Sequence, residues 1–271
     1  MAASTKFYPT NYMQAALVTS VTSWATGYPK ENLLDNNPDT SWKGTSTADQ
    51  VIKIDLGSAK NVDCILLRLR NYTTDFSAAR LKLEHSTDDV TYTTQFTGVA
   101  LANNTSRPYF KVGQTGGVFG TNNNRRYWQL TISSLPAVIE LSQIILAYSA
   151  GYILAVANEL PQALSETYYN RHEKGPGGRR FNAAINKHAV QIINRTYRIN
   201  GTTNYGILLA LFDAVQGGLL PCVIIDDADD ATTRFVYIDS DTWQATEEAY
   251  QLYRITLNLV EVPYIAAGET Y

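Results

Sequence analysis

Hydrophobic and polar residues alternate along most of the first half of the chain. The clearest case is residues 52–56, where Ile-Lys-Ile-Asp-Leu is followed by glycine. A period of two places the apolar side chains on one face, so this run predicts a half-buried strand. Similar runs follow at residues 62–69, 81–85, 92–96, 109–112, 127–132 and 139–148. Turn-forming residues separate them and no helical period intervenes, which predicts a β-sandwich or jelly roll.

The second half combines strand patterns with one helical period. Apolar residues recur at helical spacing between residues 207 and 215, after an N-cap candidate at Thr203 or Asn204 and before Gly217 and Gly218. This arrangement predicts one amphipathic helix. Strands are expected at residues 190–199, 219–225, 234–238 and 252–262. Together they are typical of a small α+β domain, in which one helix lies on a sheet.

The regular pattern breaks down between the two halves. Residues 175–180 read Gly-Pro-Gly-Gly-Arg-Arg, a composition typical of a flexible segment. We therefore expect a β-sandwich in residues 1–148, a linker or arm in 149–180, and an α+β domain in 181–271. Residues up to 150 carry a net charge of +2 and the rest −5, which favours two separate modules.

The composition is that of a globular protein. Hydrophobic residues make up 45% of the 271, charged residues 17%, and the net charge is −3, unlike a disordered chain or a basic nucleic-acid-binding protein. The longest apolar run, residues 150–157, is far shorter than the ~20 residues that cross a bilayer, so we expect no membrane span and no export signal. Cys64 and Cys222 lie in apolar surroundings and are expected to be buried free thiols.

A motif in the first half resembles a known family. Residues 28–42 contain an Asn-Leu-Leu-Asp element and a Thr-Ser-Trp element, and residues 51–57 read Val-Ile-Lys-Ile-Asp-Leu-Gly. In this order the elements resemble the opening of the discoidin-like (coagulation factor C-type) jelly roll. The resemblance implies a β-sandwich that binds a ligand rather than catalysing a reaction.

The likeness continues downstream. Residues 81–89 resemble the family's strand followed by a Ser-x-Asp-Gly turn, with Asp89 in place of the glycine. Residues 126–132, Arg-Tyr-Trp-Gln-Leu-Thr-Ile, resemble its penultimate strand. The resemblance therefore covers about residues 20–148.

The resemblance also implies a calcium site. In this family an Asp-x-Asn loop often wraps a calcium ion together with a glutamate from the last strand. Asp35, Asn37 and Thr40 match the loop, and Gln143 stands where the glutamate usually does. A neutral amide in place of a carboxylate weakens such a site. A structural calcium ion and a purely hydrogen-bonded turn thus stay open as alternatives, and no other cofactor is expected.

Aromatic residues in the same half are candidates for stacking on sugar rings, on the expectation that they are exposed. They are Trp24, Tyr28, Tyr72 and Phe76. Ligand loops vary within the family, so the resemblance does not assign them a role.

The second half is similar to a group of bacteriophage tail proteins. Residues 217–227, 234–238 and 253–262 follow the order of their Gly-x-x-x-Pro strand, aspartate-containing turn and terminal strand. The resemblance implies a structural virion protein of the tail tip or baseplate, assembled in the host cytoplasm. Its C-terminal domain would form a homo-oligomeric ring, because ring closure removes exposed sheet edges. The first half would contact neighbouring tail proteins or a host-surface glycan.

The alternative is a stand-alone, non-catalytic carbohydrate-binding module. An enzyme is not expected, because the chain has no Gly-x-Ser-x-Gly or His-Glu-x-x-His motif and no cysteine with an obvious histidine partner. The acidic residues 226–230 predict a solvated hairpin turn. The basic residues 174–180 predict an arm that orders against a neighbouring subunit.

Overall fold

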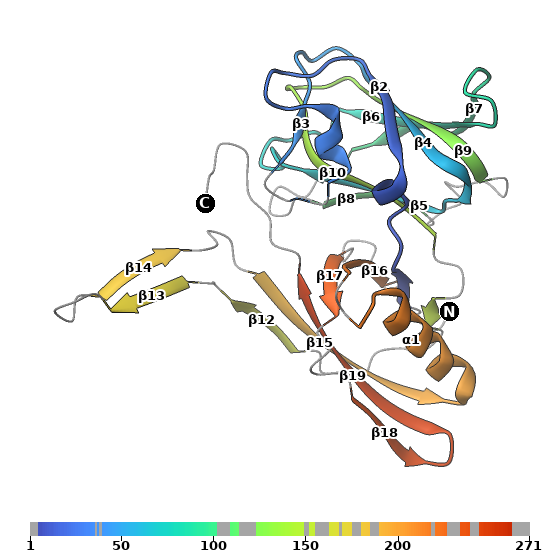
Figure 1. The fold of residues 1–271 in the computed structure, drawn as a ribbon, viewed down its shortest axis with the longest axis vertical. Coiled ribbons are helices and arrows are strands. Elements are labelled where there is room, and N and C mark those ends of the chain that lie inside the picture. The colour runs from blue at the N-terminus through green and yellow to red at the C-terminus, as the bar shows by residue number, and fades with distance from the viewer. Residues whose placement is uncertain are drawn as a thin grey trace. The chain divides into compact units, whose positions relative to one another are not determined.

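The computed structural model describes residues 5–35, 37, 40–101, 109–113, 123–148, 152–154, 163–167, 170–174, 180–184, 190–217, 220–226, 234–238 and 244–261. These residues form two compact units (Figure 1). The sandwich unit contains residues 11–148, and the second unit contains residues 1–10 together with 149–265. The sandwich unit is thus inserted in the sequence of the second unit.

The sandwich unit contains two antiparallel sheets in its described residues. One has the order β2-β4-β9-β6-β7 and the other β3-β10-β5-β8. The strands of the first sheet are β2 (Leu17–Val21), β4 (Gln50–Asn61), β9 (Asn124–Ser133), β6 (Arg80–Ser86) and β7 (Thr93–Ala100). Those of the second are β3 (Trp42–Lys43), β10 (Glu140–Ala147), β5 (Cys64–Leu69) and β8 (Tyr109–Gly113). Two 3-10 helices, η1 (Tyr12–Ala15) and η2 (Lys30–Leu33), contact β10.

The alternation read from the sequence matches the burial of these strands. Ile52 and Ile54 on β4 are buried, whereas the intervening Lys53 is only partly buried. The rings of Trp42 and Trp128 are fully buried and fill the core of the unit. Burial of large apolar side chains is the main favourable contribution to the stability of such a sandwich.

The second unit is one sheet with a helix. Its order is β11-β1-β16-β17-β19-β15-β12, and β18 also pairs with β19. The strands are β11 (Ile153–Leu154), β1 (Thr5–Tyr8), β16 (Cys222–Asp226), β17 (Arg234–Ile238), β19 (Leu252–Glu261), β15 (Val190–Asn200), β12 (Ala163–Thr167) and β18 (Gln244–Ala249). A separate antiparallel pair is formed by β13 (Asn170–Lys174) and β14 (Arg180–Ala184).

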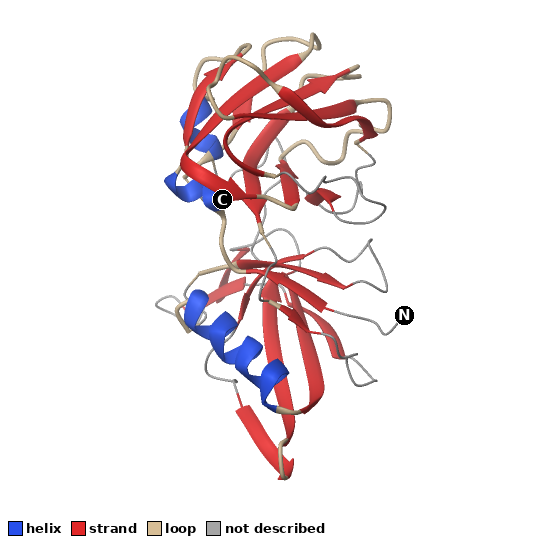
Figure 2. Cartoon of the chain, turned by 90° about the vertical axis from the view of Figure 1, so that its right-hand side faces the viewer, coloured by secondary structure: helices blue, strands red, loops and turns tan. Residues whose placement is uncertain are grey.

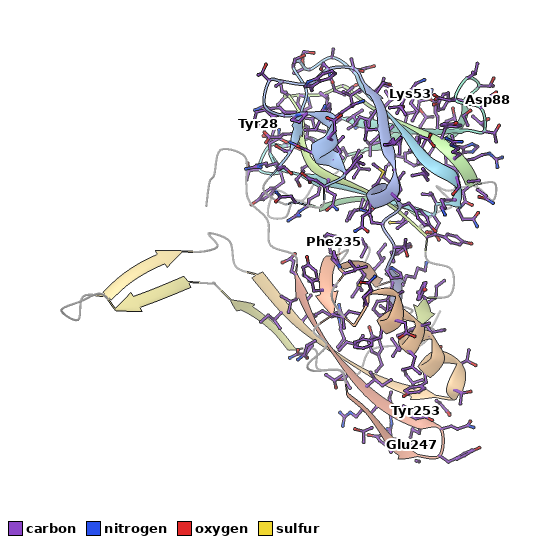
Figure 3. The ribbon with its side chains drawn as sticks, viewed as in Figure 1. Tyr28, Lys53, Asp88, Phe235, Glu247 and Tyr253 are labelled. Atoms are coloured by element: carbon purple, nitrogen blue, oxygen red, sulfur yellow. The ribbon has the colours of Figure 1, made fainter. Side chains whose placement is uncertain are left out.

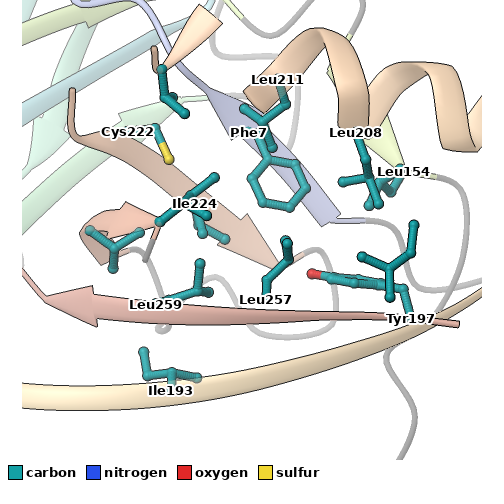
Figure 4. Close-up of a cluster of buried hydrophobic side chains, with 14 of the residues drawn as sticks. Phe7, Leu154, Ile193, Tyr197, Leu208, Leu211, Cys222, Ile224, Leu257 and Leu259 are labelled. Atoms are coloured by element: carbon teal, nitrogen blue, oxygen red, sulfur yellow. The ribbon is translucent and has the colours of Figure 1, made fainter. Parts of the chain in front are cut away.

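The helix α1 (Thr202–Ala214) lies along one face of this sheet (Figure 2). It buries Leu208 and Leu211 against a cluster that includes Phe7 and Leu257 (Figure 4). The predicted helix is confirmed, but its first turn differs from the prediction. Gly201, with φ +88°, precedes the helix, so the N-cap candidates Thr203 and Asn204 lie inside it.

The predicted stop of the helix matches the structure at Gly217. This residue has φ +67°, and its N–H donates to the carbonyl of Phe212 at 2.9 Å. A left-handed residue with such a bond is the usual end of a helix, and glycine adopts it at little cost. Gly218 lies outside the described residues.

The predicted fold class is confirmed: the chain is mainly β, with a sandwich in the first half and a sheet with one described helix in the second. Cys64 and Cys222 are buried free thiols, as expected, and burial raises the pKa of Cys222 to about 12. In the parts of the chain that the structure describes, no helix is long and apolar enough to cross a membrane.

Segment boundaries differ from the sequence analysis in two places. The strand β1 belongs to the second unit, although residues 1–148 were expected to form the sandwich. The stretch 149–180, expected to be a linker or arm, includes β11, β12 and β13. The loop residues 227–230 and 175–179 lie outside the described residues.

Candidate functional site

A loop between β2 and η2 presents two aromatic side chains. Trp24 is 53% exposed, and Tyr28 is partly buried. Tyr28, labelled in Figure 3, lies near the position of β3 in the same view of Figure 1. A large exposed indole on a folded domain is a common feature of ligand-binding surfaces, because its apolar face is available for contact.

Two hydrogen bonds hold this loop against β3. The backbone N–H of Ala25 donates to the carbonyl of Lys43 at 2.8 Å. The indole Nε1 of the buried Trp42 donates to the carbonyl of Ser23 at 3.0 Å. Trp24 lies between these two anchored residues. Its backbone is therefore fixed before any ligand arrives, which lowers the entropic cost of binding.

Side-chain hydrogen bonds link the same loop to residues 45–48. The hydroxyl of Ser23 donates to Oε1 of Gln50 at 3.0 Å and accepts from the backbone N–H of Thr45 at 3.1 Å. Nε2 of Gln50 donates to the carbonyl of Ala48 at 2.8 Å. Both loops are thereby fixed relative to each other, which gives a rigid border of polar groups beside the aromatic residues.

Lys43 adds a positive charge to this surface. Its Nζ lies 5.4 Å from the ring centroid of Tyr28, within the range of a cation–π interaction. The same Nζ is 3.4 Å from Oε2 of the buried Glu140. Lys43 thus lies against Tyr28, and the exposed Trp24 is on the same loop as Tyr28. These three residues, called the aromatic surface below, offer an exposed ring and charged N–H donors to a ligand.

The F5/8 type C domain family model matches residues 17–115. The described part of this stretch runs from β2 to β8 and includes the aromatic surface. This part of the chain is similar to an F5/8 type C domain. The predicted discoidin-like module is therefore supported for these residues.

Solved structures of carbohydrate-binding modules are also similar to the chain. CBM32-3 from a family 31 glycoside hydrolase of Clostridium perfringens is 22% identical, covers 50% of this chain and 92% of its own, and has a TM-score of 0.40. Chitosan-binding module 1 from a chitosanase/glucanase of Paenibacillus sp. IK-5 is 16% identical, covers 51% and 99%, and has a TM-score of 0.41. CpGH89CBM32-5 from Clostridium perfringens, in complex with GalNAc-beta-1,3-galactose, is 13% identical, covers 51% and 100%, and has a TM-score of 0.43.

Curated proteins include no match to the chain. None of the comparisons supports the phage tail domain expected in the second half, and that domain stays a prediction.

Two of the four aromatic candidates in the F5/8 type C-like unit are buried. Tyr72 is 3% exposed and Phe76 is fully buried, so the expectation that they are exposed is wrong. Tyr72 lies in a turn where the backbone N–H of Thr74 donates to the carbonyl of Asn71, and Phe76 begins the next turn, where its carbonyl accepts from the backbone N–H of Ala79. Both rings are buried in the core, although most of their neighbours in the sequence are polar. Trp24 and Tyr28 remain the candidates that a ligand can reach.

The predicted calcium ligands form a hydrogen-bonded turn. Oδ1 of Asp35 accepts from the backbone N–H of Asn37 at 2.9 Å, and Oδ2 accepts from the hydroxyl of Thr40 at 2.6 Å. Gln143 is buried on β10. Calcium requires six to eight oxygen ligands, and each Asp35 oxygen that accepts one of these hydrogen bonds keeps a second lone pair. The described residues of this loop form the expected turn. Residues 36, 38 and 39 lie outside the described residues, and the calcium ion stays a prediction. Among the residues that the structure describes, no group of three or more His, Cys, Asp or Glu could hold a metal.

The turn between β6 and β7 contains a second polar cluster, near the Asp88 label in Figure 3. Oδ1 of Asp88 accepts from the backbone N–H groups of Val90 and Thr91 at 3.0 and 2.9 Å and from the hydroxyl of Ser86 at 2.8 Å. These hydrogen bonds lower the pKa of Asp88 to about 2. The Asp88 carboxylate therefore stabilises the turn, and its Oδ1 already accepts three hydrogen bonds.

Neighbouring side chains complete this turn. Asp89 has φ +60°, which explains why the family has glycine at this position and why aspartate is tolerated here. The hydroxyl of Tyr92 donates to Asp89, and Nζ of Lys53 lies 3.8 Å from the same carboxylate and 4.9 Å from the ring centroid of Tyr92. The Asp89 carboxylate is paired with the Lys53 ammonium and the Tyr92 hydroxyl, so we interpret this cluster as structural.

The sequence patterns did not identify Lys43 or Ser23 as candidate site residues. Lys43 directly follows the Trp42 of the Thr-x-Trp motif, but its contact with Tyr28 exists only once β3 lies beside the loop. No local pattern marks either residue.

Proposed function

We propose that the F5/8 type C-like unit is a non-catalytic carbohydrate-binding module, and that its ligand contacts Trp24 and Tyr28. The observation that carries this proposal is the exposure of Trp24, at 53%, on a loop that hydrogen bonds hold on both sides. The match of residues 17–115 to the F5/8 type C family supports the same role.

The expected binding is weak. A sugar presents C–H groups on one face and hydroxyls at its edge, so it pairs with one ring face and a few polar groups. An aromatic contact contributes about 0.5–1.5 kcal/mol beyond the area it buries, and an ordinary hydrogen bond contributes a similar amount. Only a few such contacts fit this surface, and Kd values on the order of 0.1–1 mM are expected.

A glycan array followed by isothermal titration calorimetry tests the proposal. We expect Trp24→Ala to weaken binding by about 3–10-fold, because one aromatic contact is lost, without lowering Tm. Tyr250→Ala is the matched control, because Tyr250 is also an exposed ring, at 87%, but lies in the second unit. An array without a single hit, or unchanged affinity in Trp24→Ala, would count against the proposal.

The role in a phage tail stays a prediction from the resemblance of the second half. Ring assembly through the second unit, contacts with neighbouring tail proteins, and location in the virion all depend on that resemblance. A carbohydrate-binding module is consistent with one part of this prediction, which is contact between the first half of the chain and a host-surface glycan.

A further inference from the structure

The ammonium group of Lys43 has unused hydrogen-bonding capacity. A lysine carries three donors, and those of Lys43 make no hydrogen bond to any residue that the structure describes. Oε2 of Glu140, its partner in an ion pair, is 3.4 Å away, which is longer than the 2.7–2.9 Å typical of a charged hydrogen bond. By contrast, Nζ of Lys82 lies 2.7 Å from Glu84. Lys43 can therefore still donate to a ligand.

The carboxylate of Glu140 is shared between Lys43 and a second cation, Arg70. This carboxylate is buried, accepts from the hydroxyl of Ser41 at 2.7 Å, and lies 3.6 Å from Nε of Arg70 as well as 3.4 Å from Lys43. One carboxylate thus faces two cations. Of the two, Lys43 is the more exposed, at 38% of its side chain against 13% for Arg70. Lys43 is therefore the cation of this cluster that reaches solvent.

We propose that the saccharide bound at this surface carries a carboxylate, and that Lys43 binds it. This inference rests on the proposed function. The Lys43 ammonium lies over the Tyr28 ring, 5.4 Å from its centroid, so a sugar that packs at the edge of that ring brings its substituents near Nζ. A carboxylate there gains a charge-assisted hydrogen bond, which is roughly twice as strong as the bond from a neutral hydroxyl. Uronic and sialic acids are the saccharides that carry such a group.

Matched ligand pairs test the inference by calorimetry on the full chain. One pair is trigalacturonate and its methyl ester, which removes the charge but keeps the backbone. The other is sialyllactose and the methyl ester of its carboxyl group. We expect the acid of one pair to bind about 5–10-fold more tightly than its neutral partner at low salt, because one charge-assisted hydrogen bond is gained. The preference should shrink in 0.5 M NaCl, because salt screens an exposed ion pair. The pair that shows the preference identifies the source of the carboxylate.

Variants assign the preference to a residue. Lys43→Gln should bind acid and neutral ligands equally, and Lys43→Arg should retain the preference. Lys60→Gln is the matched control, because Lys60 also lies over a tyrosine ring, that of Tyr12, at 5.9 Å. Tm measurements show whether each variant is folded, and Lys43→Met replaces Lys43→Gln if the latter is not.

The outcomes separate the two proposals. Equal binding of acid and neutral ligands, still reduced in Trp24→Ala, overturns the inference and leaves the carbohydrate-binding function intact. An acid preference that persists in Lys43→Gln also overturns it. Failure of every ligand, together with an array that has no hits, overturns both proposals.

Discussion

Arg126 on β9 binds Asp55 on β4 through two parallel hydrogen bonds. Nε of Arg126 lies 2.7 Å from Oδ1 of Asp55, and Nη2 lies 2.8 Å from Oδ2. The backbone N–H of Gly57 donates to the same Oδ1 at 2.8 Å. These bonds, the arginine's first among them, hold the pKa of Asp55 below its ordinary value of 3.8. The pair joins residues 51–57 to residues 126–132, two of the segments that resemble the discoidin-like family.

This pair makes the stability of the sandwich unit depend on pH. Because the pKa of Asp55 is lower in the folded state, its contribution is complete above about pH 5 and is lost as the pH falls through the folded pKa. We expect Arg126→Gln to be less stable than the natural protein at pH 7, and the difference to disappear toward about pH 2. Urea unfolding at a series of pH values measures this difference.

Arg125→Gln is the control for this prediction. The guanidinium of Arg125 donates to the backbone carbonyl of Asn124, so its removal should not change the loss of stability below about pH 5. Between pH 7 and pH 5 its removal acts only through the pKa of His85. If Arg126→Gln were equally destabilised at pH 7 and pH 2, its effect would come from packing and not from the charge pair.

His85 predicts a second pH dependence, in a higher range. The residue is buried on β6 with its ring edge toward Trp128, and its Nδ1 has no hydrogen-bond partner among the described residues. Burial, followed by the charge of Arg125, lowers its pKa from the ordinary 6.5. The unfolded chain therefore binds a proton before the folded one, and stability falls as the pH drops below about 7. We expect the free energy of unfolding to decrease from pH 7 to pH 5.

Replacing the imidazole isolates its share of that decrease. His85→Gln should show a shallower slope between pH 7 and pH 5, measured by urea unfolding of both proteins. The difference between the two profiles removes the contributions of His172 and His188, which both proteins share. Parallel profiles would contradict the assignment to His85.

Stacked tyrosine rings connect α1 to β19 in the second unit. The rings of Tyr205 and Tyr253 lie 4.4 Å apart at an angle of 17°. We expect Tyr253→Ala to lower the Tm of this unit, because the stacked contact between helix and sheet is lost. Tyr250→Ala, three residues away and 87% exposed, should leave it unchanged. Differential scanning calorimetry compares the two variants, and equal effects would show that the stack does not stabilise the unit.

The N-terminal strand is predicted to be essential for the second unit. The backbone N–H of Phe7 donates to the carbonyl of Tyr152 at 3.0 Å, and the ring of Phe7 is fully buried in the cluster beneath α1. Phe7→Ala should destabilise the second unit by about 3–5 kcal/mol and leave the sandwich unit unchanged. Hydrogen exchange followed by mass spectrometry reports on each unit separately.

Ile153→Ala is the control on the neighbouring strand. Ile153 pairs with Lys6 but is 37% exposed, so its truncation leaves a smaller cavity. Faster exchange in the sandwich unit of Phe7→Ala would contradict the assignment of β1 to the second unit.

Long strands with one buried face could be predicted from the sequence, and short ones could not. The alternation in β4 and β19 is strong because every second side chain enters a core. The strand β1 has only four residues, and its partner β16 begins more than 200 residues later. Only long-range pairing makes β1 a strand, so no local window contains the signal.

The candidate site was predictable in part, for a similar reason. Trp24 could be found because a large aromatic residue among turn-forming residues is conspicuous in a sequence. The contact between Lys43 and Tyr28 could not, because it requires β3 to lie beside the loop. Phe76 shows the opposite error, since polar neighbours do not reveal which way a ring points.

The position of β1 in the sequence affects how the chain folds during its synthesis. The ribosome releases β1 before the whole sandwich unit, whereas its partners β11 and β16 follow that unit. The sandwich unit can fold during translation. The rings of Phe7 and Tyr8, in contrast, stay exposed until residue 226 of their partner strand has left the ribosome. A nascent strand in this state is open to chaperones and to neighbouring chains on the same polysome.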